Sequence, residues 1–176
     1  YRDGALGTPP AEQIFTSYAQ LDGIMESGAP ARSTEGGVVE ADPERARTFM
    51  NMLYRRSARS VEEVARALRP HMQDGEQWLD VGGGHGRYGE ALRERCGAQL
   101  TLFDRTVCVD VARERFGDSQ QYLTGDFMTD PLGGPYDGAL LSNIVHGLGL
   151  EENRTLFRRL GDVIKPGGLL VLKDMF

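Results

Sequence analysis

The 176-residue sequence has little cysteine, little lysine and no long hydrophobic run. Its two cysteines, Cys96 and Cys108, stand outside any CxxC or Cys/His spacing, so we expect reduced thiols and no metal site. The apolar runs are far shorter than the roughly 20 residues of a membrane span. Charge and glycine follow Tyr1 where a secretory leader would have a basic segment and an apolar core, so we expect no leader in these residues. The formal net charge of -6 argues against nucleic acid as a partner. We therefore expect a cytoplasmic globular protein with a small-molecule partner.

The first 70 residues have a helical pattern. Apolar residues spaced by three or four predict a helix over residues 11–26, and the glycine-rich segment 27–41 predicts a loop. Asp42-Pro43-Glu44 combines an N-cap, a proline suited to the first helical position and a first-turn acid, so it predicts a helix start. The apolar face then continues to Pro70. We expect one long helix there.

After Pro70, short apolar segments alternate with amphipathic ones, a pattern typical of an α/β fold with a parallel sheet. Lys165-Pro166-Gly167-Gly168 is expected to end the last helix as a turn. The predicted strands cover residues 77–82, 99–104, 120–124, 136–143 and 168–174, and the predicted helices cover residues 86–96, 107–116 and 151–164.

A glycine-rich loop lies where the first predicted strand meets the next helix. Gly82, Gly84 and Gly86 permit a sharp turn and a close backbone approach to a ligand, and the helix N-terminus offers free N–H groups. Asp104 ends the second predicted strand, where an acid can accept hydrogen bonds from ribose hydroxyls. The sequence therefore predicts a nucleotide-type cofactor.

Two cofactors fit this loop. Residues 84–89 satisfy GxGxxG, so NAD stays open, although that pattern alone is weak. Three features favour S-adenosylmethionine: Asp80 before the glycines, the Gly125-Asp126-Phe127 step, and the turn at residues 165–168. Asp80 can hold a cationic amino group, directly or through water. Asp126 can accept a hydrogen bond from an adenine amino group while Phe127 lies against the ring.

At these residues the chain resembles the S-adenosylmethionine-dependent O-methyltransferases of the plant caffeate and bacterial antibiotic-tailoring type. The resemblance covers residues 42–176 and is strongest over Trp78–Gly89 and Leu140–Asp174. It implies a Rossmann-like class I methyltransferase fold with parallel strands in the order 3-2-1-4-5, preceded by part of an all-helical dimerisation domain. It also implies S-adenosyl-L-methionine as cofactor, no metal, and a homodimer for the full-length protein.

The resemblance also implies a role for each matching position. His146 matches the family's catalytic base and Asp174 the acid that orients it, and a neutral imidazole is suited to removing a hydroxyl proton near neutral pH. The chain has Gly147-Leu148 where many members have Asp-Trp, and Ser142 where many plant members have a cofactor-binding lysine. The positions matched to cofactor binding are Asp80, Gly82, Gly84, Gly86, Asp104, Asp126, Phe127 and Ser142.

These observations predict a helical segment over residues 1–70 and a catalytic domain over residues 71–176, which we expect to be C-terminally truncated because relatives continue with further strands. The expected reaction is methyl transfer to a hydroxyl of a small aromatic secondary metabolite, with His146 as general base. The alternatives are an NAD-dependent oxidoreductase and a non-catalytic, methyltransferase-like binding module. A nucleic-acid methyltransferase is disfavoured because its Asp/Asn-Pro-Pro-aromatic tetrad is replaced by Ser142-Asn143-Ile144-Val145.

Overall fold

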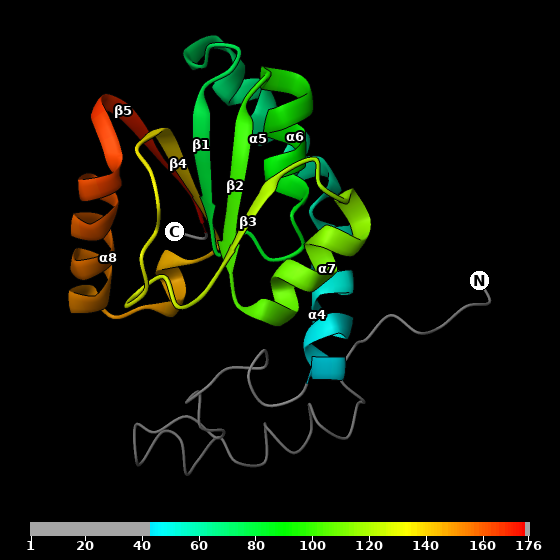
Figure 1. Cartoon of the computed structure of the whole chain (residues 1–176). Helices are drawn as coiled ribbons and strands as arrows, with labels where there is room; N and C mark the ends of the chain where they lie inside the picture. Colours follow the sequence, from blue (N-terminus) through cyan, green and yellow to red (C-terminus); the bar gives the residue numbers. More distant parts are fainter. Residues whose placement is uncertain (1–42, 175–176) are drawn as a thin grey trace.

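The computed structural model describes residues 43–174 (Figure 1). The predicted helix over 11–26, the loop over 27–41 and Asp42 lie outside the described residues. The elements are, in chain order, α4 (Pro43–Arg56), α5 (Ala58–Leu68), the 3-10 turn η1 (Arg69–His71), β1 (Gln77–Val81), α6 (Arg87–Cys96), β2 (Gln99–Asp104), α7 (Thr106–Phe116), β3 (Gln121–Thr124), β4 (Tyr136–Ser142), the 3-10 turn η2 (Val145–Gly147), α8 (Leu150–Val163) and β5 (Ile164–Lys173).

The five strands form one sheet in the order β3-β2-β1-β4-β5. Every neighbouring pair is parallel. This confirms the predicted fold class, and the predicted strand bounds agree to within a residue except at β5. In a parallel sheet all the strands end on the same side, so the segments that follow them meet at one edge. We call it the carboxyl edge.

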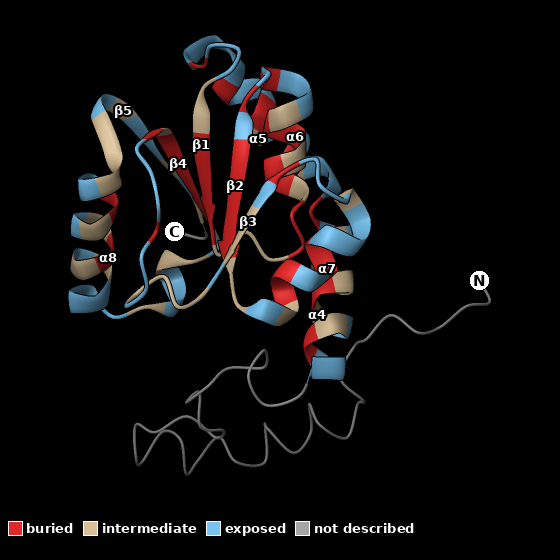
Figure 2. Cartoon of the chain, in the orientation of Figure 1, coloured by how far each residue is buried: buried red, intermediate tan, exposed pale blue. Residues whose placement is uncertain are grey.

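Both faces of the sheet are covered by helices, and alternate residues of β1 show how (Figure 2). Trp78 packs with residues of α5 and α6, whereas Leu79 and Val81 pack with Leu156 and Leu160 of α8. Because side chains alternate between faces along a strand, a strand buried on both sides has apolar residues at consecutive positions. Asp80 is the polar exception among the four buried residues of β1, and its side chain is also fully buried.

The prediction of one long helix before Pro70 is wrong, because the segment forms two helices, α4 and α5, that are separated at Ser57. The carbonyl of Tyr54 accepts hydrogen bonds from Ser57 Oγ at 3.0 Å and from Arg87 Nη1 at 2.6 Å. These side-chain donors take the place of a backbone donor one turn later, and such competition disrupts a helix. The observed α4 nevertheless begins at Pro43 with Glu44 in its first turn, as predicted.

The expected turn at residues 165–168 is a bulge inside β5. Ile164 already pairs with Tyr136, and pairing resumes where Leu169 faces Gly138, so the residues between them are extra to the ladder. Lys165 Nζ donates to Asp137 Oδ1 at 2.7 Å and fixes the bulge. Pro166 is tolerated there because a bulged residue needs no ladder donor. Strand β5 therefore starts at Ile164, four residues earlier than predicted.

Strand β5 is an edge strand of the described sheet. Its Leu169, Leu170 and Leu172 side chains are 37%, 41% and 39% exposed, respectively. An apolar edge with this exposure is a surface on which another chain segment can pair or pack.

Candidate functional site

The glycine loop follows β1 and leads into α6 at the carboxyl edge. Gly82, Gly84 and Gly86 have φ values of +63°, +53° and +75°, a region that side chains disfavour. A Cβ on Gly84 would approach Met50 Sδ to 3.2 Å, so helix α4 lies against the loop. The three glycines are thus required by backbone conformation, as the sequence predicted.

The carboxyl group of Asp80 lies beneath this loop. It occupies the space that side chains would need at Gly83 and Gly89. A Cβ added to Gly83 would lie 2.8 Å from Asp80 Oδ2, and one added to Gly89 would lie 3.3 Å from it. That oxygen accepts a hydrogen bond from the Gly89 N–H at 3.2 Å, while Asp80 Oδ1 has no partner within the described part of the chain. Burial raises the pKa of Asp80 to about 7, with the Gly89 N–H opposing the rise and the charge of Asp104 adding a smaller contribution to it.

Asp104 connects the end of β2 to the glycine loop. Its Oδ2 accepts a hydrogen bond from the Gly84 N–H at 2.7 Å, and its Oδ1 accepts one from the Arg105 N–H at 2.7 Å. Burial raises the pKa of the Asp104 carboxyl, and the two backbone donors partly offset that rise. The acid that was predicted to bind ribose is therefore already oriented by the loop.

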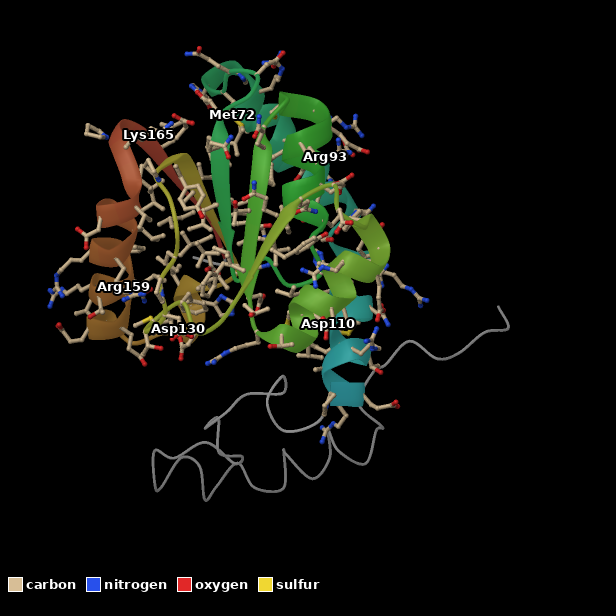
Figure 3. The ribbon with its side chains drawn as sticks, viewed as in Figure 1. Met72, Arg93, Asp110, Asp130, Arg159 and Lys165 are labelled. Atoms are coloured by element: carbon tan, nitrogen blue, oxygen red, sulfur yellow. The ribbon has the colours of Figure 1, made fainter. Side chains whose placement is uncertain are left out.

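Asp126 and Phe127 follow β3 at the same edge. Asp126 Oδ2 pairs with Arg105 Nη2 at 3.0 Å, and Asp126 Oδ1 accepts the Met128 N–H at 2.7 Å. Arg159 of α8 donates to the Phe127 carbonyl at 3.0 Å and also to the Asp130 carbonyl, and Figure 3 labels Arg159 and Asp130 in the same region of the molecule. These contacts fix the segment between β3 and β4 on both sides.

The turn after β4 carries His146. Its Nδ1 lies 2.5 Å from Oδ1 of Asp174, a residue directly after β5. Asp174 Oδ2 also accepts the backbone N–H of Val145 at 2.9 Å. The carboxylate is 1% exposed while the His146 side chain is 40% exposed, so the acid is buried behind an accessible imidazole. The structure thus brings together the predicted base and the predicted acid.

Two asparagines shape this turn, and sequence reasoning missed both. Asn143 adopts a φ of +59°, and its Oδ1 accepts a hydrogen bond from Lys173 Nζ at 2.6 Å. Asn153 of α8 donates through Nδ2 to the carbonyls of Val145 and Leu148 at 3.0 Å and 3.1 Å. Asn143 offered a weak signal, because asparagine is among the few residues that tolerate this conformation. Asn153 offered none.

The turn after β4 contacts the glycine loop. A Cβ on Gly82 would overlap the side chain of Ile144 and would lie 3.8 Å from Phe127. Ser142, the remaining predicted site residue, ends β4 at this edge, and its buried Oγ has no hydrogen-bond partner in the described residues. All ten predicted site positions therefore lie at the carboxyl edge of one sheet.

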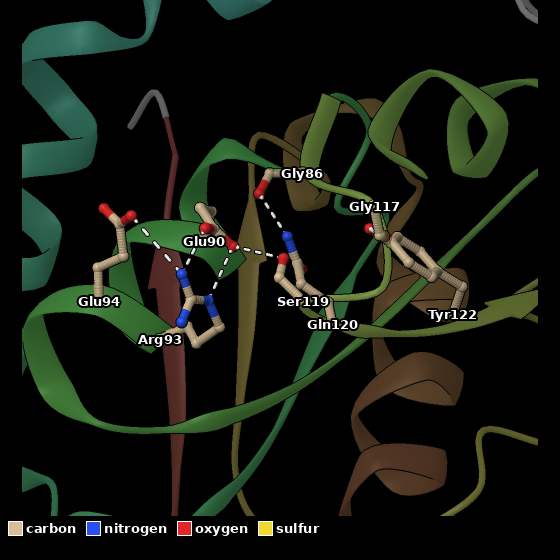
Figure 4. Close-up of polar contacts among 8 residues, drawn as sticks. All are labelled: Gly86, Glu90, Arg93, Glu94, Gly117, Ser119, Gln120 and Tyr122. Carbon is tan, nitrogen blue, oxygen red and sulfur yellow. Dashed lines mark hydrogen bonds and ion pairs between the residues drawn. The ribbon is translucent and has the colours of Figure 1, made fainter. Parts of the chain in front are cut away.

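Gln120 is a further residue that the sequence did not indicate. It lies just before β3 and its Nε2 donates to the carbonyl of Gly86 at 3.2 Å (Figure 4). Its Oε1 is buried without a partner among described residues and would lie 2.7 Å from a Cβ on Gly89. Gln120 thus holds the end of the glycine loop through its hydrogen bond to the Gly86 carbonyl. Its type and position carry no periodic or motif signal.

Several other predicted features lie elsewhere or have other contacts. Residues 165–168 lie near the start of β5, at the end of the sheet opposite the site, and Figure 3 shows Lys165 and Asp130 far apart. They therefore give no support to the choice of cofactor. Both cysteines are free and buried. Across residues 43–174 no cluster of acids, histidines and cysteines suits a metal ion, and no helix is long and apolar enough to cross a membrane.

Known proteins resemble the chain over most of its length. An O-methyltransferase domain family model matches residues 31–176. The tetracenomycin polyketide synthesis 8-O-methyl transferase TcmO of Streptomyces glaucescens is 26% identical over 170 residues, covering 92% of this chain and 49% of that protein. The N,N-dimethyltransferase OxyT of Streptomyces rimosus is 28% identical over 180 residues, covering 94% of this chain and 51% of that protein.

Solved structures agree with the fold. Human N-acetylserotonin methyltransferase in complex with SAM superimposes with a TM-score of 0.74 at 22% identity, covering 92% of this chain and 49% of that one. The chain thus spans about half the length of the relatives that it matches. Because the family model matches most of the sequence, the chain belongs to the O-methyltransferase domain family.

Proposed function

We propose that this chain is the cofactor-binding and base-bearing part of an S-adenosylmethionine-dependent O-methyltransferase of the antibiotic-tailoring type. We propose as its acceptor a hydroxyl group of a small aromatic metabolite. The observation that carries the proposal is the pairing of Asp174 with His146, which lies on a turn that contacts the glycine loop. Family membership favours S-adenosylmethionine over NAD.

The residues of the loop fit the proposed cofactor. The unpartnered, buried Oδ1 of Asp80 suits a cationic amino group, which the methionine portion has and a dinucleotide lacks. The glycine loop presents backbone instead of side chains, so a ligand can approach it closely. A carboxylate has about four acceptor positions, so Asp104 retains capacity for ribose hydroxyls beyond the donors that it already meets. Asp126, Phe127 and Ser142 are proposed as further cofactor contacts.

When bound, S-adenosylmethionine supplies an electrophilic methyl group on sulfur. His146 would remove the acceptor's hydroxyl proton at Nε2, because its Nδ1 faces the Asp174 carboxylate. The buried carboxylate fixes the tautomer and stabilises the imidazolium that forms. Asn153 holds the backbone of the turn, so the imidazole keeps its orientation. Alignment of the acceptor oxygen with the methyl group supplies further rate.

Titration calorimetry with S-adenosylhomocysteine, and separately with NAD, tests the cofactor. Binding of the first and not the second supports the proposal, and binding of NAD alone would replace it with an oxidoreductase. Methyl transfer from S-adenosylmethionine to a panel of phenolic acceptors tests the reaction. Binding of S-adenosylhomocysteine by the full-length protein without any transfer would favour a non-catalytic binding module.

An amine acceptor is a second candidate. The relative OxyT is named an N,N-dimethyltransferase, so a protein similar to this chain is named for transfer to nitrogen. A neutral amine needs no base to become nucleophilic, so this alternative predicts that loss of His146 has little effect on rate. Paired acceptors that differ only by hydroxyl or amino group distinguish the two.

A cytoplasmic homodimer for the full-length protein belongs to the same proposal, and sedimentation equilibrium tests the dimer.

A further inference from the structure

Helix α4 packs on the glycine loop and on α7, although it was expected to belong to a separate helical segment (Figure 1). Met50 lies within reach of Gly84 and shares a hydrophobic cluster with Cys108 and Val111 of α7. Polar contacts add to this packing, since Arg47 pairs with Glu114 on α7. Helix α4 is therefore a neighbour of the loop in its own right.

The ring of Tyr54 on α4 has cations over it. The guanidinium carbons of Arg115 and Arg87 lie 4.2 Å and 4.5 Å from the ring centroid. The imidazole of His85, in the glycine loop, meets the same ring edge-on with 5.8 Å between centroids. Cations within about 6 Å of an aromatic face are attracted by its quadrupole. One side chain of α4 thus contacts the loop, the start of α6 and the end of α7.

The backbone of Tyr54 adds a second link to the same segment. Its carbonyl accepts the hydrogen bond from Arg87 Nη1 at 2.6 Å. Arg87 in turn donates its backbone N–H to His85 Nδ1 at 3.2 Å, which requires a neutral imidazole. Burial, and then the charges of Arg115 and Arg87, lower the pKa of His85 to about 4, so the imidazole is neutral at neutral pH. His85 and Arg87 flank the left-handed Gly86 on either side.

We propose that Tyr54 is a positioning residue for the glycine loop, which its ring and carbonyl hold through His85 and Arg87 on either side of Gly86. The consequence for cofactor affinity rests on the proposed function. Tyr54 is only partly buried, so its loss leaves no large core cavity. Its effect should therefore appear in the loop more than in global stability.

Amide hydrogen exchange without ligand tests the proposal directly. The amides of Gly84 and Gly86 are suitable reporters, because they donate to Asp104 Oδ2 and to the Gly83 carbonyl. We expect Tyr54→Leu to speed exchange at these amides about tenfold. Tyr54→Phe keeps the ring, so its exchange rates should be close to those of the unchanged chain. Unchanged exchange in Tyr54→Leu would overturn the proposal.

Tyr122 provides a matched control, because it is a partly buried tyrosine with the guanidinium of Arg113 at 4.8 Å from its ring, and its hydroxyl donates to the carbonyl of Gly117, which follows α7. Tyr122→Leu should leave exchange at Gly84 and Gly86 unaltered, and an equal acceleration there would reject a specific role for Tyr54. If Tyr54→Leu does not fold, Arg87→Met combined with Arg115→Met removes both cations from the Tyr54 ring and the hydrogen bond to the Tyr54 carbonyl, and it should also speed exchange. No acceleration would overturn the proposal.

Calorimetry then measures the effect on the ligand. We expect S-adenosylhomocysteine to bind Tyr54→Leu about tenfold more weakly than the unchanged chain, with full affinity in Tyr54→Phe and Tyr122→Leu. Equal affinity in all of these proteins would overturn the role in cofactor binding. If the unchanged chain does not bind S-adenosylhomocysteine, the proposed function fails, while the ligand-free exchange still decides whether Tyr54 holds the loop.

Discussion

The Nδ1 atom of His146 lies 2.5 Å from Oδ1 of Asp174, across the ends of two neighbouring parallel strands. Residues 28 positions apart meet because β4 and β5 end at the same edge and the turn after β4 bends back toward β5. The backbone N–H of Val145 donates to the same carboxylate. The acid therefore orients both the imidazole and the turn that carries it.

Replacing His146 with alanine tests the base. We expect His146→Ala in the full-length enzyme to lower kcat for a hydroxyl acceptor by roughly 100- to 10,000-fold, because the proton acceptor is lost. The affinity for S-adenosylhomocysteine should stay within about twofold, because no cofactor contact is assigned to this side chain. His71→Ala, at an exposed histidine before β1, is the control. Full activity of His146→Ala would remove the residue from the mechanism.

Asp80 should make stability fall as pH rises. Its folded pKa is raised to about 7 from an ordinary value of 3.8, so the folded state binds more protons than the unfolded state between these values. Relative to the unchanged chain, Asp80→Asn should gain stability as pH rises from about 4 to 7, by at most about 1.4 kcal/mol per pH unit. Urea unfolding at a series of pH values measures this difference, and parallel curves would contradict it.

His85 should act in the opposite direction. Its folded pKa is lowered to about 4 from 6.5, so the unfolded state binds more protons in this window and stability falls as pH drops from 6.5 to 4. His85→Asn retains an acceptor for the Arg87 N–H but cannot take up this proton. Its free energy of unfolding should therefore decline less than that of the unchanged chain over the same range. The same urea series decides, and an equal decline would show that His85 is not responsible.

Asp126 should contribute to recognition of the adenine amino group. Exchanging S-adenosylhomocysteine for its inosine analogue replaces the amino donor with a carbonyl, so the unchanged chain should prefer the adenine form about five- to tenfold. Asp126→Asn carries its own N–H donor and should reduce that preference. Calorimetric Kd values for the two ligands give the ratio. An unaltered ratio would place the adenine away from Asp126.

Gly138 tests packing independently of function. A Cβ on this β4 residue would lie 2.6 Å from the ring of buried Trp78, so Gly138→Ala should cost about 1–3 kcal/mol of stability. Gly161 in α8 has open space around it, and Gly161→Ala should stabilise the protein by about 0.5–1 kcal/mol. Thermal unfolding should show a lower Tm for Gly138→Ala and a higher Tm for Gly161→Ala than for the unchanged chain. A neutral Gly138→Ala would mean that Trp78 can move aside.

The sequence predicted elements whose signals are local. The glycine loop combines a buried strand, three glycines that need positive φ and a helix start, and all three are visible in adjacent residues. The pairing of Arg105 with Asp126 is different, because it depends on the register in which Asp104 of β2 faces Thr124 of β3. No periodicity within either strand determines that register.

Tertiary contacts also explain the errors at element ends. Helix α4 stops at Arg56 because the Tyr54 carbonyl accepts hydrogen bonds from Ser57 Oγ and from Arg87, which is 33 positions away in the chain. No glycine or proline marks the site. Strand β5 starts early because Ile164 pairs with Tyr136 ahead of the bulge. In both cases a distant partner overrode a pattern that was correct for an isolated segment.

The Asp104 carboxylate accepts hydrogen bonds from the N–H groups of both Gly84 and Arg105. These two bonds have a thermodynamic consequence for any ligand that binds at the carboxyl edge. A free aspartate must lose side-chain rotamer entropy when it binds a ligand, and that loss weakens association. Here the rotamer is selected during folding, so the entropic cost belongs to the stability of the domain. A ligand that meets this carboxylate encounters a preorganised acceptor, and its binding should show little reorganisation of β2.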